Sequence, residues 1–242
     1  MDISFFPQTF DERNRDIRYG DLVSEDDKYL VTLVADGMHQ QVDPLSYWRY
    51  VSKLPADKFV LIDAWLRMSD IGVGLFWLVK SYWFLVSERK QRYNFNGIEI
   101  SRFIRQELVW SSSRIARLVL MIGPLRRVIN RLNIKELVYL NFEYAFGRMI
   151  SFVLGKYFPE VVRTGFNHGD YSWRFLNYFL AKGEARQAPP YIDYCPIPDR
   201  VLAEDELCAE IYEHNGYQCV EIMKEVNRLK YLEEIIPARL EK

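Results

Sequence analysis

The residues of this chain that are best suited to chemistry lie close together, between Glu143 and Asp170. His168 stands in a small polar turn of sequence Asn-His-Gly-Asp, where an imidazole could act as a general acid or base or donate a hydrogen bond to a phosphate. Asp170 could orient His168 or act as the base itself, and Glu143 could act as a base or bind a ligand. Structural roles are the alternatives: His168 and Asp170 could hold the turn, and Glu143 could stabilise the start of a following helix.

A strand–helix–strand pattern surrounds these residues. Residues 137–142 and 161–166 are short β-branched and aromatic runs, typical of buried strands, and residues 146–158 carry apolar side chains at helical spacing. Ligands of open α/β sheets bind beyond the carboxyl ends of the strands. The pattern therefore predicts that Glu143 and His168 lie at the same edge of a sheet, within reach of each other across a shared cleft.

Strands and helices alternate along the rest of the chain, which predicts a single Rossmann-like α/β domain with a mostly parallel sheet and helices on both faces. We expect a loosely ordered polar lead-in at residues 1–27, the domain at residues 28–236 and a short tail at residues 237–242. The other predicted strands are residues 29–35, 59–64, 200–203 and 219–223. The other predicted helices are residues 44–54, 70–92, 98–109, 114–132, 205–215 and 225–234.

Several helix boundaries have their own sequence signals. The three serines at 111–113 are expected to cap the helix at residues 114–132. Gly123-Pro124 is expected to kink or split that helix, because proline lacks a backbone donor and clashes with the preceding turn. Asn215-Gly216 is expected to form a left-handed cap.

Composition excludes several classes of protein. The chain has 242 residues, 49% of them hydrophobic, and a net charge of −1, which is typical of a soluble globular protein and argues against a nucleic-acid binder. Its three cysteines lack paired-ligand spacing, so neither a disulfide framework nor a metal site is expected, and a reducing compartment fits best. The first residues show no signal-peptide pattern, which favours a cytoplasmic protein. Phosphate-loop, dinucleotide and nucleophile-elbow signatures are absent.

Aromatic and cationic side chains occur together in residues 76–92. This combination suits a membrane interface or a lipid-phosphate ligand, and it implies peripheral contact with the inner face of a membrane. The competing interpretation, which the usual burial of aromatic side chains favours, is core packing with a charged helix end.

The segments FEYAFGR, RTGFNHGDYS, IPDRVLAEDELCAEIYEHNGYQCVEIM and NRLKYLEEI resemble the bacterial surface-carbohydrate biosynthesis glycosyltransferases of the two-Rossmann (GT-B) type. The resemblance covers roughly residues 94–235. The chain departs from it at Asn167, where the family's turn usually has Gln, and at Phe146-Gly147, where tryptophan is often found. The matching elements are Glu143, Gly165–His168, Pro198-Asp199, Gly216-Tyr217 and Arg228–Leu232.

The resemblance implies transfer of a sugar from a nucleotide-sugar to a saccharide or lipid-linked acceptor, in the biosynthesis of a lipopolysaccharide or capsule. The nucleotide-sugar would be a co-substrate, and no other cofactor is implied. Because the chain ends at Lys242, near the expected end of a first Rossmann domain, it resembles the acceptor-side half of such an enzyme. The implied catalytic residues are His168, Glu143 and Asp170, and the implied substrate-binding residues are Asn167, Gly165, Gly169 and Arg148.

Two other functions remain open at this stage. The chain could be a non-catalytic binding or scaffold half that pairs with a second Rossmann domain on a separate, donor-binding chain. It could also be a small hydrolase that uses His168 and Asp170, although no nucleophile is visible in the sequence.

Overall fold

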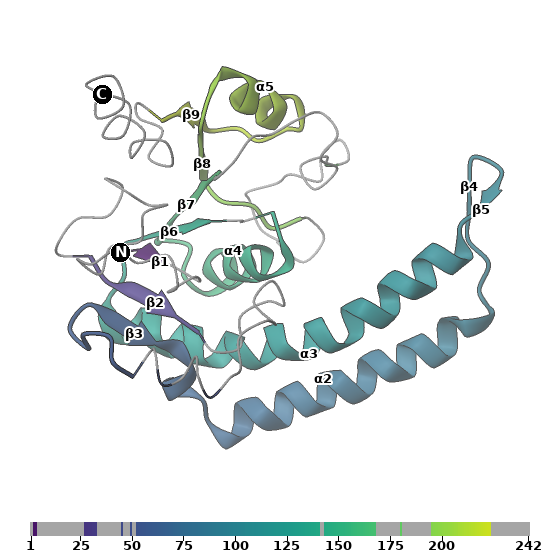
Figure 1. Ribbon diagram of the computed structural model, residues 1–242, viewed down its shortest axis with the longest axis horizontal. Coiled ribbons are helices and arrows are strands. Elements are labelled where there is room, and N and C mark those ends of the chain that lie inside the picture. Colours follow the sequence, from purple (N-terminus) through teal and green to yellow (C-terminus); the bar gives the residue numbers. More distant parts are fainter. Residues whose placement is uncertain are drawn as a thin grey trace, which may run out of the picture.

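A computed structural model describes residues 2–3, 27–32, 45, 49, 52–140, 143–167, 180 and 195–223. Within these residues the protein is a seven-stranded parallel sheet flanked by helices, with a pair of long helices that extends away from the sheet (Figure 1). The prediction of an α/β protein with a parallel sheet is confirmed. The strands of this sheet are β1 (Asp2–Ile3), β2 (Tyr29–Val31), β3 (Phe59–Leu61), β6 (Glu136–Leu140), β7 (Val162–Phe166), β8 (Arg200–Ala203) and β9 (Val220–Ile222).

The strands lie in the order β3-β2-β1-β6-β7-β8-β9, and every pairing between neighbours is parallel. The first three strands therefore follow one another in one direction across the sheet, and the last four in the opposite direction. The reversal falls between β1 and β6, at the centre of the sheet.

The N-terminal strand departs from the sequence prediction. Residues 1–27 were expected to be a loosely ordered lead-in, but Asp2–Ile3 form the central strand β1, where Ile3 lies opposite Leu30 and Tyr139. A strand of two residues is too short to show the alternation by which strands are recognised, so the sequence pattern could not reveal it. At β3, the predicted strand of residues 59–64 is too long, because Ile62–Trp65 form the 3-10 helix η4.

Three helices cover one face of the sheet: α3 (Ser101–Leu132), α4 (Ala145–Tyr157) and α5 (Glu206–His214). The crossovers that contain them run from β3 to β6, from β6 to β7 and from β8 to β9, all in the same direction. Because such crossovers are right-handed, they place their helices on the same face. Leu137 and Tyr139 of β6 point to this face and belong to the same core cluster as Leu125 of α3 and Ile150 of α4.

The opposite face of the sheet is also buried. Val138 and Leu140 of β6 cluster there with Phe166 and Leu202. None of the helices whose bounds are described contributes to this cluster, so the expectation of helices on both faces is confirmed for one face and stays a prediction for the other. The helix predicted at residues 225–234 lies outside the described residues, and of residues 44–51 only 45 and 49 are described, both helical.

Residues 68–117, which we call the arm, form a helical hairpin that extends beyond the sheet (Figure 1). Helix α2 (Met68–Ser87) runs outward and is followed by the 3-10 helix η5 (Glu88–Lys90). Strands β4 (Asn94–Phe95) and β5 (Ile98–Glu99) then form an antiparallel turn, and the first half of α3 runs back. Asn96 and Gly97 have φ angles of 48° and 82°, as a two-residue hairpin turn of type I′ requires.

The prediction of two helices, at residues 98–109 and 114–132, is wrong, because α3 is one continuous helix of 32 residues. The serines at 111–113 lie inside it and not at a helix start; Ser112 Oγ donates to the carbonyl oxygen of Leu108 within the same helix (2.6 Å). Pro124 also lies inside the helix. Its neighbours Leu125 and Val128 are buried in the core, and this packing offsets the backbone hydrogen bond that proline removes.

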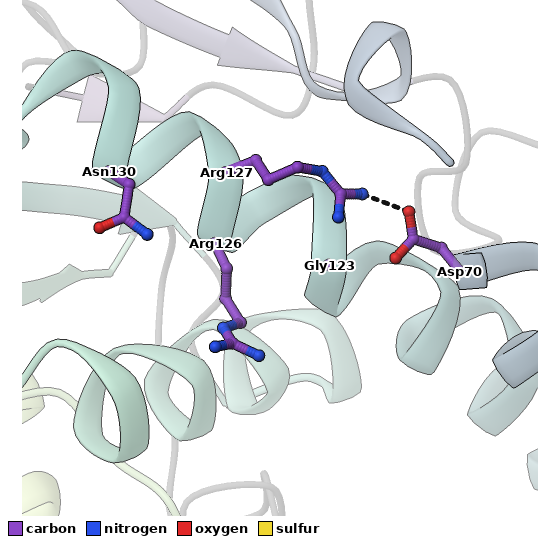
Figure 2. Close-up of a pocket in the computed structure, with 5 residues that line it drawn as sticks. All are labelled: Asp70, Gly123, Arg126, Arg127 and Asn130. Carbon is purple, nitrogen blue, oxygen red and sulfur yellow. Dashed lines mark hydrogen bonds and ion pairs between the residues drawn. The ribbon is translucent and has the colours of Figure 1, made fainter. Parts of the chain in front are cut away.

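A joint fixes the inner end of α2 to α3. The Asp70 carboxylate accepts a hydrogen bond from the backbone N–H of Arg67 (2.7 Å) and forms an ion pair with Arg127, whose Nε donates to the carbonyl oxygen of Trp65 (2.9 Å). Figure 2 shows the Asp70 and Arg127 side chains pointing toward each other beside Gly123. A Cβ at position 123 would clash with Asp70 Oδ1 and lie 2.8 Å from Asp70 Cγ. A side chain at position 123 would therefore displace the Asp70 carboxylate from the joint.

Gly123→Ala is expected to lower the free energy of unfolding by about 1–3 kcal/mol, because the added methyl group displaces Asp70 from Arg67 and Arg127. Gly72→Ala is the matched control: Gly72 is also helical, and an added Cβ there meets nothing within 4 Å. Since alanine favours helix over glycine, the control should raise stability by up to about 1 kcal/mol. Urea denaturation of the wild type and the two variants measures both effects. Equal changes in the free energy of unfolding of the two variants would contradict the role of Gly123 at the joint.

Candidate functional site

Three buried polar residues follow the carboxyl ends of three neighbouring strands. Glu143 follows β6, Asn167 follows β7 and Glu204 follows β8, and these residues are 7%, 2% and 8% exposed. Since β6, β7 and β8 are parallel neighbours, all three residues lie along the same edge of the sheet. Polar groups at the carboxyl edge are typical of ligand sites in α/β proteins.

Glu143 has the most favourable position of the three. It follows β6, the strand that pairs with β1 where the strand order reverses. Neighbouring connections leave such a point on opposite faces of the sheet, which opens a crevice, and ligands of doubly wound sheets bind there. Position alone therefore places Glu143 beside the expected ligand crevice.

Glu143 belongs to a cluster with Arg148 and Tyr217. Arg148 Nε donates to the carbonyl oxygen of Glu143 (3.2 Å), and Arg148 Nη1 donates to the carbonyl oxygen of Pro196 (3.3 Å). Burial raises the pKa of Tyr217 to about 12; the Arg148 guanidinium opposes this rise, and the Glu143 carboxylate adds to it. The Tyr217 phenol therefore keeps its proton at neutral pH.

These contacts give Arg148 a positioning role. They tie the loop that follows β6 to the segment that precedes β8, two parts of the chain that border the same site. The sequence analysis assigned Arg148 to substrate binding on the resemblance, and that assignment stays a prediction.

Asn167 is held at the end of β7 by the neighbouring strand and helix. Its backbone N–H donates to the carbonyl oxygen of Leu202 (3.1 Å), and its Nδ2 donates to Cys208 Sγ in the first turn of α5 (3.6 Å). The next residue is His168. The structure therefore places the start of the predicted polar turn at the same edge as Glu143.

Three predicted site residues, His168, Gly169 and Asp170, lie outside the described residues. Their positions relative to Glu143 stay predictions. Gly165, an implied substrate-binding residue, lies inside β7, opposite Tyr139 and Val201. It belongs to the sheet because β7 has a partner strand on each side, and the turn can begin only after Phe166.

Two residues were not identified as site residues from the sequence: Glu204, which is at this edge, and Tyr217, whose pKa responds to Glu143 and Arg148. Glu204 could have been found by the rule that selected Glu143, since it directly follows the strand predicted at residues 200–203. Tyr217 was noted only as part of a motif. The residue before it, Gly216, has a φ of 89°, so the left-handed cap predicted at Asn215-Gly216 is confirmed.

Two ion pairs of the described strands and their flanks lie at the opposite, amino edge. Arg163, 4% exposed, binds Asp199 through Nε (2.9 Å) and Nη2. Glu136 accepts hydrogen bonds from Thr164 Oγ1 (2.7 Å) and Arg200 Nη2 (2.6 Å), which joins β6, β7 and β8. Burial raises the pKa of Glu136, but these two hydrogen bonds and the charge of Arg200 lower it by more, so that the net shift is downward. These groups hold neighbouring strands together and lie away from the carboxyl edge.

A cavity of about 270 Å³ lies beside the joint between α2 and α3, and no carboxyl-edge residue lines it (Figure 2). Its cations are already engaged by the protein: Arg127 pairs with Asp70, and the Arg126 guanidinium stacks over the Tyr157 ring at 3.8 Å. In the part of the chain that the structure describes, no cluster of three or more His, Cys, Asp or Glu side chains could hold a metal ion. The lining residues are Asp70, Gly123, Arg126, Arg127 and Asn130.

Comparison with known proteins adds no relative to this description: no protein-family model, no curated protein and no solved structure matches the chain. The class that the structure itself defines is an α/β protein with a parallel sheet flanked by helices.

Asp205, which follows Glu204, caps α5 through a hydrogen bond from the backbone N–H of Cys208 (2.7 Å). Asp205→Ala is expected to lower the free energy of unfolding by about 1 kcal/mol at neutral pH, because the first turn of α5 loses this acceptor. The same hydrogen bond lowers the pKa of Asp205 in the folded protein. The carboxylate therefore stabilises the fold above the unfolded-state pKa of about 3.9, and this contribution is lost as the pH falls.

The stability difference between the wild type and Asp205→Ala should accordingly narrow below about pH 4. Asp205→Asn, which keeps an oxygen acceptor without the charge, is the control and should show a smaller loss that does not depend on pH. Denaturant titrations across the acid range measure both differences. A stability difference between the wild type and Asp205→Ala that grows as the pH falls would contradict the role of Asp205 as the cap of α5.

Proposed function

We propose that this chain is a glycosyltransferase of the GT-B kind, or the acceptor-binding half of one, in the biosynthesis of a bacterial surface polysaccharide. It would transfer a sugar from a nucleotide-sugar to a saccharide or lipid-linked acceptor, in the cytoplasm at the inner face of the membrane. The observation that carries the proposal is the buried carboxylate of Glu143 at the carboxyl end of β6, beside the reversal of the sheet.

The strand order supports the Rossmann-like part of this proposal. If the two short strands at the tip of the arm are left out, the order of the sheet becomes 3-2-1-4-5-6-7. A 3-2-1-4-5-6 order is that of Rossmann sheets, which bind nucleotides across the crevice where the order reverses. The sequence resemblance at Glu143, Pro198-Asp199 and Gly216-Tyr217 points in the same direction.

The reaction sets two requirements for such a site. A bond forms between an acceptor oxygen and the anomeric carbon, and the bond between that carbon and a phosphate oxygen of the nucleotide breaks. A base must take the acceptor proton, and hydrogen-bond donors must stabilise the charge that develops on the leaving phosphate.

In this proposal Glu143 binds acceptor hydroxyls or takes the proton, and His168, oriented by Asp170, is the alternative base. The start of α4 at Ala145 lies two residues after Glu143, and a helix N-terminus favours anions because its first N–H groups lack partners within the helix. Asn167 and the turn after it would contact the sugar or the phosphate. Arg148 would keep the loop of Glu143 in place.

Glu143→Gln is expected to reduce turnover by roughly 10²- to 10⁴-fold if Glu143 is the base, because the amide cannot accept a proton. Glu160→Gln is the matched control, since Glu160 is exposed in the turn before β7, at the amino edge of the sheet. Sugar transfer is measured with the purified chain, or with the chain and its donor-binding partner if activity requires one. Normal turnover in both Glu143→Gln and His168→Ala would remove the catalytic assignment.

Titration with ligands distinguishes a whole enzyme from an acceptor-binding half. A half should be stabilised by the saccharide acceptor and not by nucleotide-sugars, because few groups of this chain would converge on the nucleotide. A ligand at about 100 times its Kd stabilises a single-site protein by about 2.7 kcal/mol, which a thermal melt detects easily. Stabilisation by nucleotide-sugar would indicate a complete donor site, and acceptor binding without turnover, even with a donor-binding chain present, would indicate a non-catalytic binding half. Stabilisation by neither class of ligand would contradict the proposal.

A further inference from the structure

The arm exposes most of the large apolar side chains found on the surface of the described residues. Of 21 such exposed residues, 16 lie between Met68 and Ile115. Among them are Val79, Trp83 and Phe103, which are 69%, 75% and 72% exposed. Soluble proteins seldom leave so many large apolar side chains of one segment exposed, and such a segment usually marks an interaction site.

The packing within the arm explains why these side chains point outward. The buried residues of α2 are small, Gly74 and Ser81. Gly74 sits so close to α3 that a Cβ would lie 3.4 Å from Leu120 Cδ1, and Ser81 Oγ donates to the carbonyl oxygen of Ser112 (3.2 Å). The surface helices of a soluble protein normally turn their large apolar residues inward. Small residues between helices with large apolar residues outside are typical of helices in contact with lipid.

The arm is also basic, although the chain is not. Residues 68–117 contain eight Lys and Arg against four Asp and Glu, a net charge of +4, whereas the whole chain carries −1, so the remainder carries −5. Exposed cations stand at the tip, at Arg89, Lys90 and Arg92, and at the start of α3, at Arg102 and Arg105. Cations beside exposed aromatic and aliphatic side chains suit the boundary between anionic headgroups and acyl chains.

We propose that the arm is a membrane-binding element that lies in the interface of an anionic bilayer. Its apolar side chains enter the acyl boundary, and its cations contact the phosphate groups of the lipids. This proposal does not depend on the glycosyltransferase proposal, because it rests on the arm and not on the carboxyl edge.

The arm binds at the surface in this proposal and does not span the bilayer. By length and composition alone, α3 could cross a membrane. Its second half, however, packs in the core of the sheet through Met121 and Leu125. The first half, residues 101–117, carries Arg102, Arg105, Arg114 and Arg117 along its length, which favours an interfacial position over the hydrocarbon core. A second copy of the chain is a less suitable occupant, because two arms of charge +4 would repel each other.

Flotation with lipid vesicles tests this proposal. The full chain should float with vesicles of mixed phosphatidylglycerol and phosphatidylcholine at low salt, and much less with phosphatidylcholine alone. High salt should weaken binding to the anionic vesicles, because it screens the cations. Failure to float with the anionic vesicles at low salt would overturn the proposal.

Two sets of substitutions separate the apolar and the charged contributions. Val79→Ser, Trp83→Ser and Phe103→Ser combined should reduce binding at least tenfold, and Arg89→Glu, Lys90→Glu and Arg92→Glu combined should remove the preference for anionic vesicles. The matched control is Val162→Ser with Leu207→Ser, two exposed apolar residues outside the arm, which should bind like the wild type.

Circular dichroism checks that each variant is folded, which is expected because every replaced side chain is exposed. Unchanged binding in both arm variants would overturn the proposal. Sedimentation equilibrium adds an independent criterion: a dimer that forms in solution and is lost in the serine variant would assign the arm to a second copy of this chain instead.

Discussion

The chain leaves β3 on one side of the sheet and must pass over β2 and β1 to begin β6, and a right-handed connection allows this on one face only. That constraint places α3 across the sheet, beside α4 and α5, and makes it part of the core. It also produces the reversal of strand order between β1 and β6, from which the carboxyl-edge site follows. The arm is the part of this long connection that the sheet does not need, and the joint of Asp70, Gly123 and Arg127 marks where it separates from the core.

The central strand–helix–strand unit could be predicted from the sequence nearly to the residue. The predicted strand at residues 161–166 and helix at residues 146–158 differ from β7 and α4 by one residue at each changed boundary. Their patterns are local, because apolar spacing and chain length are sufficient to distinguish a buried strand from an amphipathic helix. The helix does not split at Pro124, for a non-local reason: burial of the following residues in the core outweighs the local preference.

The site was predictable only in part, for a similar reason. A strand ending at residue 140 is sufficient to place Glu143 at the carboxyl edge. The contacts of Arg148 with Pro196 and of Tyr217 with the same cluster join segments 48 or more residues apart, and no spacing rule encodes them. Charged residues alone are a poor guide to the site in this sheet, since ion pairs such as Arg163 with Asp199 stabilise the amino edge. Burial of Glu143 and Glu204 at the other edge is the more informative signal.

Because α3 is a single helix of 32 residues, its first half in the arm and its second half against the sheet are fixed in their rotation about the helix axis. Each residue of an α-helix turns the chain by about 100° and advances it by about 1.5 Å. A bilayer that holds the arm would therefore also fix the orientation of the sheet, and with it the direction that its carboxyl edge faces. One residue inserted into α3 between Ser112 and Met121 would change no side chain of either region, yet it would rotate one relative to the other by about a quarter of a turn. The continuity of this helix thus links the orientation of the arm on a bilayer to the direction that the carboxyl edge of the sheet faces.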